Sequence, residues 1–147
     1  MTTAPNRLTW SNWAGNEQFA PVEIATPGSE DELVERTRQA VSDGRSIGLA
    51  GTGHSFSPIV ESSDLLIKIE GVNGIISIDP ARHTVDVLAG TTIKQMGQPL
   101  WDAGLSLKNQ GDIDTQTIVG AIATGTHGSG IGFGSFSSCV RGARIVT

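Results

Sequence analysis

The sequence predicts a mixed α+β fold with two lobes, and three patterns lead to this prediction. A strand, a helix and a second strand follow one another over residues 22–50, which is the order of a β-α-β unit. Two segments of alternating apolar and polar residues, 74–79 and 84–88, predict a β-hairpin. Glycine crowds into two regions rich in apolar residues, 44–53 and 120–134, which indicates backbone brought close to another group and not disorder.

The chain of 147 residues is long enough for one domain with a sizeable core. We place the seam between the lobes near Gly71–Gly74, so that the first lobe covers about residues 1–70 and the second about 71–147. The first lobe is expected to hold strands at Val22–Ala25 and Ser46–Ala50 and a buried strand at Leu65–Ile69.

The helix between the first two strands begins at a capping-box sequence, in which Ser29 is followed three residues later by Glu32. It is expected to end at Gly44, because glycine is common just after a helix. Its apolar face would consist of Leu33, Val34, Thr37, Ala40 and Val41.

A second capping box, Thr92 and Gln95, predicts a helix in the second lobe that runs to Ala103 and stops at Gly104. Pro99 falls inside it, so we expect a kink or an early end there.

After a polar loop at Asn109–Thr115, Thr117 is predicted to cap a short apolar helix, Ile118–Ala123. Arg144–Thr147 is expected to begin another strand.

Composition excludes several classes of protein. Lys and Arg total 10 against 15 Asp and Glu, a net charge of −5 without a basic run, so nucleic acid and anionic membranes are not expected partners. No stretch approaches the roughly 18 apolar residues of a spanning helix, and the N-terminus has no signal-peptide core, which predicts a cytoplasmic protein. Cys139 is the only cysteine, so no internal disulfide is possible; we expect it to be a half-buried apolar residue.

The first chemically informative stretch is a glycine-rich loop, Gly51–Ser55, which follows a strand and contains His54. Glycines on both sides of a threonine allow backbone N–H groups to form an anion-binding nest suited to a phosphate or pyrophosphate. No Gly-Lys-Ser/Thr follows, as a Walker A loop requires, and the third glycine of the dinucleotide fingerprint is missing. On these residues alone, an ordinary turn and an anion loop with a reactive imidazole both remain open.

The second stretch runs from Thr117 to Gly128, where small residues on a short helix would let another surface approach closely. The alternative for Gly120 and Ala121 is tight helix packing. The alternative for His127 is a loop histidine whose hydrogen bonds are satisfied within the protein.

The two stretches together, in this order and about sixty residues apart, resemble the FAD-binding (PCMH-type) domain of the vanillyl-alcohol oxidase superfamily. The nearest branch holds alditol oxidases and the aldonolactone oxidases, which act on gulono- and arabinono-lactones. Asn12–Asn16 and the segment from Ser129 through Val140–Arg141 are also similar to that branch. The resemblance covers essentially the whole chain and implies a two-lobed FAD-binding domain, here C-terminally incomplete.

The resemblance also implies roles for individual residues. Gly51, Thr52, Gly53 and Ser55 would cradle the FAD pyrophosphate, and His54 matches the histidine bonded covalently to the 8α-methyl group of the flavin. The remaining positions expected to contact FAD are Asp112, Thr117, Gly120, Ala121, Thr124, Gly128 and, at the adenine end, Val146.

In the family, the substrate's C–H bond donates a hydride to the flavin, and O₂ or another acceptor re-oxidises it. The resemblance thus implies oxidation of an alcohol carbon on a polyol or aldonolactone. The family's separate substrate domain is expected to lie outside these 147 residues, so no catalytic base for the substrate is identified.

Two other hypotheses stay open. One is a non-catalytic module that binds FAD or a partner chain and needs that partner to complete its sheet. The other is a metal site built from His54, His83, His127 and Cys139, but their spacing matches no compact ligand pattern, so no metal is expected. His83 is expected on the surface of the hairpin.

Overall fold

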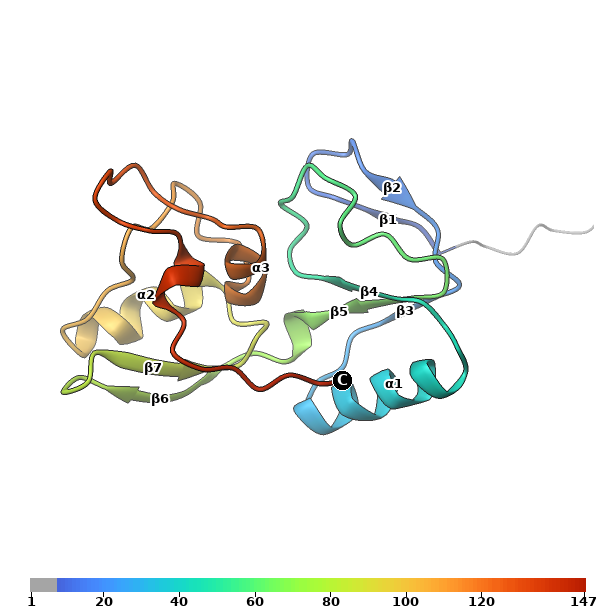
Figure 1. Ribbon diagram of the computed structural model, residues 1–147, viewed down its shortest axis with the longest axis horizontal. Helices are drawn as coiled ribbons and strands as arrows, with labels where there is room; N and C mark the ends of the chain where they lie inside the picture. Colours follow the sequence, from blue (N-terminus) through green and yellow to red (C-terminus); the bar gives the residue numbers. More distant parts are fainter. Residues whose placement is uncertain (1–7) are drawn as a thin grey trace, which may run out of the picture.

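The structure is a computed structural model that describes residues 8–147 (Figure 1). The elements up to η1 (Ile69–Gly71) gather on one side of the molecule, and the later hairpin and helices gather on the other. The seam predicted near residue 71 falls at the end of this short 3₁₀ helix. We propose that the chain divides into two lobes at this point. None of the described helices is long and apolar enough to cross a lipid bilayer.

The first side is built on a parallel three-stranded sheet in the order β3-β5-β4. These strands are β3 (Glu23–Ala25), β4 (Ile47–Ala50) and β5 (Leu65–Lys68), close to their predicted positions. The central strand, β5, is buried because Leu65, Leu66 and Ile67 are at most 1% exposed. It lies between the two strands of the predicted β-α-β unit, so β4 ends up at an edge of the sheet.

Helix α1 (Glu30–Ser42) packs against one face of this sheet, where Leu33 and Ala40 contact the side chains of β3 and β5. Its capping differs from the predicted box: Ser29 accepts a hydrogen bond from the backbone N–H of Glu32, but the Glu32 carboxylate accepts from Gly28 instead of Ser29. The prediction was also wrong for Val41, which is 62% exposed because the sheet covers only a narrow stripe of the helix.

A small antiparallel sheet, β1 (Trp10–Ser11) with β2 (Gln18–Phe19), precedes β3. The sequence did not predict these strands, because two-residue strands are too short to show alternation.

The second side contains the predicted hairpin of β6 (Ile75–Asp79) and β7 (Thr84–Val87). Its inner side chains pack on Met96 and Leu100 of helix α2 (Ile93–Asp102). The capping box at the start of α2 is complete in both directions. Pro99 does not end the helix early, because α2 continues to Asp102 before Gly104 takes a φ of 72°.

Helix α3 (Ile118–Ala123) has the predicted bounds, and the Thr117 side chain caps it. Ala121 is buried against Ile93 and against Phe136 of a 3₁₀ turn, η2 (Phe136–Cys139), that the sequence did not predict.

Two predictions for the C-terminal segment were wrong. Residues 144–147 pair with no strand among the described residues, although Arg144 forms an ion pair with Glu30 of α1, at 2.8 Å. Cys139 is exposed, because it stands at the end of η2, where its sulfur has only a 4.0 Å contact with the hydroxyl of Ser138.

Asp64 joins the starts of β4 and β5 and makes the fold sensitive to acid. The hydroxyl and the backbone N–H of Ser46 both donate to its carboxylate, at 2.7 and 2.8 Å, and these bonds lower the pKa of Asp64 below its ordinary value of 3.8. A carboxyl whose pKa is lower in the folded state contributes stability above its unfolded pKa, and the contribution disappears as pH falls through the folded pKa. We expect Asp64→Asn to lower the melting temperature at pH 7, and the difference from the wild type to shrink as pH falls below 3.8 toward the lowered pKa of the folded state. A constant difference across this pH range, in melts followed by circular dichroism, would contradict the assignment.

Candidate functional site

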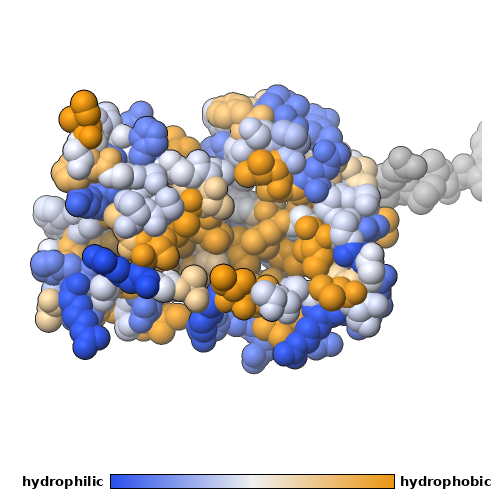
Figure 2. Space-filling model, viewed as in Figure 1, coloured by the Kyte–Doolittle hydropathy of each residue, from blue (hydrophilic) through white to orange (hydrophobic). Residues whose placement is uncertain are grey.

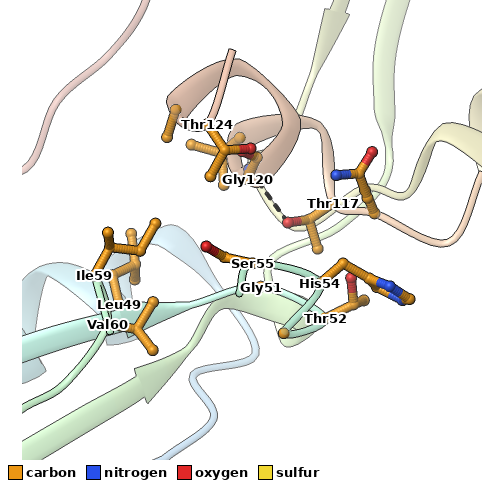
Figure 3. A pocket seen from close by; sticks show the side chains of 14 residues that line it. Leu49, Gly51, Thr52, His54, Ser55, Ile59, Val60, Thr117, Gly120 and Thr124 are labelled. Carbon is orange, nitrogen blue, oxygen red and sulfur yellow. Dashed lines mark hydrogen bonds between the residues drawn. The ribbon is translucent and has the colours of Figure 1, made fainter. Parts of the chain in front are cut away.

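The two glycine-rich stretches predicted from the sequence face each other across one cleft (Figure 3). One wall comes from the end of β4 and the loop after it, and the other from the start of α3. The cleft is lined by Leu49, Gly51, Thr52, Gly53, His54, Ser55, Ile59, Val60, Gln116, Thr117, Val119, Gly120, Ala123 and Thr124. Its lining contains no carboxylate, lysine or arginine, so the groups that can bind an anion here are backbone N–H groups, hydroxyls, the His54 imidazole and the Gln116 amide.

The loop at 51–55 has such backbone groups free. Among residues 8–147, no protein acceptor lies within hydrogen-bonding distance of the backbone N–H groups of Gly53, His54 and Ser55. Gly53 has a φ of 73°, a conformation that glycine adopts without strain. Consecutive unpaired N–H groups next to a left-handed residue are the arrangement that binds phosphates in a backbone nest.

The N-terminal segment holds this loop in place. Asn12, which is 6% exposed, donates from its side-chain amide to the carbonyl of Ser55 at 2.9 Å and accepts from the N–H of Glu17 at 3.1 Å. The N–H of Trp13 donates to the carbonyl of Gly53 at 2.9 Å. Carbonyls of the loop thus face the N-terminal segment, and its N–H groups are left for a ligand.

An Asn12→Leu variant should be destabilised by about 1–3 kcal/mol, because the buried amide is lost and its half-buried partners, the Ser55 carbonyl and the Glu17 N–H, are left unpaired. Chemical denaturation measures this loss. Asn73→Leu is the matched control: its amide also donates to a backbone carbonyl, that of Glu70 at 2.7 Å, but the side chain is exposed and has no bond to Asn12, so we expect a change below about 0.5 kcal/mol. Equal losses in the two variants would contradict the role of Asn12.

The His54 ring contacts two neighbours from distant parts of the chain. Its imidazole stacks on the indole of Trp13, with ring centroids 5.3 Å apart and an interplanar angle of 26°. Its Nε2 atom lies 3.0 Å from the hydroxyl oxygen of Thr115. In Figure 3 the ring extends past Thr117 toward one end of the cleft, whereas Ser55 points toward α3.

The opposite wall is fixed by backbone bonds to the start of α2. The N–H of Ile93 donates to the carbonyl of Gln116 at 3.0 Å, and the N–H of Ile118 donates to the carbonyl of Thr91 at 2.7 Å. These bonds place Thr117, which is 1% exposed, directly beside Gly51. A Cβ atom at Gly51 would overlap the hydroxyl oxygen of Thr117, so the close approach of the two walls requires glycine there.

Gln116 carries the strongest sign that the cleft holds a polar ligand. Its side-chain oxygen is buried and has no hydrogen-bond partner, while its amide nitrogen donates to Thr126 at 3.1 Å. Buried polar atoms are nearly always paired, so an unpaired one in a cleft wall points to a missing donor such as the N–H of a ring. The free N–H groups and this acceptor together fit a cofactor that has both a pyrophosphate and a ring edge with a donor.

The structure places the other predicted site residues elsewhere. Ala121 is completely buried in the core behind α3. Asp112 and Gly128 line a second, more open depression beside His127. Val146 does not line the cleft; it lies two residues after Arg144, which is ion-paired with Glu30 of α1. The remaining eight predicted residues lie together in the cleft lining.

Six cleft residues were not predicted from the sequence: Leu49, Ile59, Val60, Gln116, Val119 and Ala123. Leu49 had a detectable signal, because alternation along β4 places it opposite the buried Gly48 and Ala50. The others depend on how loops fold back on the sheet, for which the sequence offers no periodic signal.

Within residues 8–147, no group of three or more histidine, cysteine or acidic side chains could hold a metal ion. His83 is exposed in the β6–β7 turn, and His127 is an exposed loop residue whose Nδ1 atom lies 2.8 Å from the carbonyl of Gly128. The placement of His83 agrees with the prediction, and that of His127 corresponds to the alternative of a loop histidine bonded within the protein.

The chain is similar to a described protein family and to several curated proteins. The family described as "FAD binding domain" matches residues 21–147. L-gulono-1,4-lactone dehydrogenase of Mycobacterium tuberculosis is 38% identical over 138 residues, covering 94% of this chain and 32% of that protein. D-arabinono-1,4-lactone oxidase of Saccharomyces cerevisiae is 33% identical, covering 94% and 27%, and alditol oxidase of a Streptomyces species is 30% identical, covering 93% and 33%. The chain thus spans about a third or less of the curated relatives it matches.

Solved structures share the fold at lower identity. Cholesterol oxidase from B. sterolicum superimposes with a TM-score of 0.72 at 22% identity, over 87% of this chain and 27% of that one. An alkyldihydroxyacetonephosphate synthase gives a TM-score of 0.67 at 23% identity, over 74% and 22%. At these identities the likeness concerns the fold alone.

Proposed function

Because this chain belongs to the FAD-binding domain family that matches residues 21–147, we propose that it is the cofactor-binding part of a flavin-dependent oxidoreductase acting on an alcohol carbon of a sugar alcohol or aldonolactone. The observation that carries the proposal is the single cleft in which both predicted glycine-rich stretches meet, with free N–H groups on one wall and an unpaired acceptor on the other. The substrate class rests on the names of the relatives, which act on gulono- and arabinono-lactones and on alditols.

We assign the roles of the cleft residues as follows. The backbone of Gly51–Ser55 binds the pyrophosphate, and Thr117, Gly120 and Thr124 line the ring and ribityl end. Gln116 is added to this set because its unpaired oxygen can accept from a ring N–H. Asp112, Ala121, Gly128 and Val146 stay as proposed contacts; their placement outside the cleft lining restricts them to the periphery of the cofactor or to support of the wall.

The proposed role of His54 is to carry the cofactor covalently. When bound, FAD accepts a hydride and passes electrons to O₂ or another acceptor. The bond to His54 would join a ring nitrogen to the 8α carbon in place of one C–H bond, with the proton released to solvent and the electron pair passed to O₂. The chain contributes an imidazole that stacking on Trp13 keeps at the end of the cleft.

A second candidate is a non-catalytic module that needs a partner chain. It is supported by the edge position of β4, where Ile47 is 36% and Leu49 46% exposed and an added strand could pair. This candidate predicts colourless protein that self-associates, which separates it from the first.

The deciding measurement is an absorbance spectrum of the purified protein before and after acid precipitation. We expect the visible absorbance of flavin to stay with the pellet. Flavin found only in the supernatant would keep the FAD-binding role and remove the covalent bond. Protein without flavin, even after incubation with FAD, would overturn the proposal for this chain.

A further inference from the structure

We propose that Thr115 is a positioning residue that, together with Trp13, fixes the orientation of the His54 imidazole in the cleft. This inference rests on the proposed role of His54 as the cofactor-carrying residue. Thr115 does not line the cleft, and neither its sequence context nor the resemblance had singled it out.

The His54 ring is held through one of its two nitrogens. The bond to the Thr115 hydroxyl occupies Nε2, at 3.0 Å, and no described group lies within hydrogen-bonding distance of Nδ1. A histidine ring held by one nitrogen has its other nitrogen directed by that bond, as second-sphere hydrogen bonds direct histidines that bind metals. Thr115 therefore determines which nitrogen faces the cofactor space.

The backbone around Thr115 is held in place by hydrogen bonds. Thr115 lies between two residues whose backbones are anchored to the start of α2: the carbonyl of Asp114 accepts from Lys94 at 2.8 Å, and the carbonyl of Gln116 accepts from Ile93 at 3.0 Å. The hydroxyl is therefore presented from a fixed segment although the side chain is exposed. A hydrogen bond from such a segment restricts the ring better than one from a mobile loop.

The plane of the His54 ring is restricted by Trp13. Stacking on Trp13 removes rotation of the imidazole about its Cβ–Cγ bond, and the N–H of Trp13 is itself bound to the carbonyl of Gly53, next to His54. The indole is 69% exposed and also meets Phe56 edge-on, at 6.5 Å, so its main protein contacts here are the two rings of this loop. Trp13 thus sets the plane of the His54 imidazole, and Thr115 sets which of its nitrogens faces the cleft.

The test compares Thr115→Val, which removes the hydroxyl at similar volume, with Thr115→Ser, which keeps it. In the flavin-free protein, ¹⁵N–¹H correlation spectra report the two ring nitrogens of His54. We expect the Nε2 resonance to move in Thr115→Val and to stay in place in Thr115→Ser. After addition of FAD, acid-stable flavin should form about tenfold more slowly in Thr115→Val, the usual effect of one lost hydrogen bond, with total bound flavin unchanged.

Trp13→Ala should slow the same step, and Trp101→Ala is its matched control, since Trp101 is an equally exposed tryptophan on α2, at 75%. Unchanged His54 resonances in Thr115→Val, or a wild-type rate of attachment, would overturn the inference. If the wild type forms no acid-stable flavin, the covalent role of His54 fails; the nitrogen resonances still decide whether Thr115 orients the ring.

Discussion

A His54→Ala variant is expected to lose all flavin that survives acid precipitation, while it keeps flavin that is bound without a covalent bond. The imidazole is the strongest nucleophile among the side chains of the cleft lining, because the other members are unactivated hydroxyls, an amide, glycines and apolar side chains. The N–H groups proposed to hold the pyrophosphate belong to the backbone and remain after the substitution. Absorbance of the acid pellet and of the supernatant measures the two fractions separately.

The matched control is His127→Ala, because His127 is an exposed histidine in the other glycine-rich stretch and its ring contacts a backbone carbonyl outside the cleft. We expect this variant to keep wild-type acid-stable flavin. Flavin in the pellet of His54→Ala would show that another residue carries the bond.

The second large effect is expected from Gly51→Ala, which should lower flavin affinity by about ten- to a hundredfold, the equivalent of 1–3 kcal/mol of overpacking. The added methyl would overlap the Thr117 hydroxyl, and this hydroxyl cannot retreat because it caps α3 and is buried. The two walls of the cleft would therefore move apart. Fluorescence titration with FAD in the His54→Ala background, where binding is reversible, measures the affinity.

Gly97→Ala provides the control for glycine replacement itself, since no atom lies within 4 Å of the added Cβ there. We expect it to leave flavin affinity unchanged. Combining Gly51→Ala with Thr117→Ala removes the oxygen that is overlapped, so part of the lost affinity should return. Equal affinities of the single and double variants would contradict the steric explanation.

Local signals in the sequence were sufficient for most of the helices and strands. Ser29, Thr92 and Thr117 each cap the helix they were predicted to cap, because a capping side chain acts on backbone within three residues. The apolar run of β5 and the alternation of β6 and β7 were also predicted correctly, because these patterns lie within each strand and need no distant contact to be recognised.

The errors concern properties that depend on distant contacts. Exposure of Val41 and Cys139 depends on how much of each element a neighbour covers. The strand predicted at residues 144–147 can form only if another strand lies beside it. The sequence of these four residues carries no information about such a neighbour. Likewise, Trp13 and Thr115 gain their proposed roles only by meeting His54, and neither has a residue pattern that announces the contact.

The bond between His54 and Thr115 joins residues 61 positions apart, and the contact of Gly51 with Thr117 spans a similar length. Contacts of such separation require closure of a long loop, so they are expected to form after the helices and the hairpin. During synthesis, the first wall would be complete well before the second wall is made. The chain would thus be unable to capture its cofactor until the second wall has folded against the first, so bound flavin would report that the cleft has assembled.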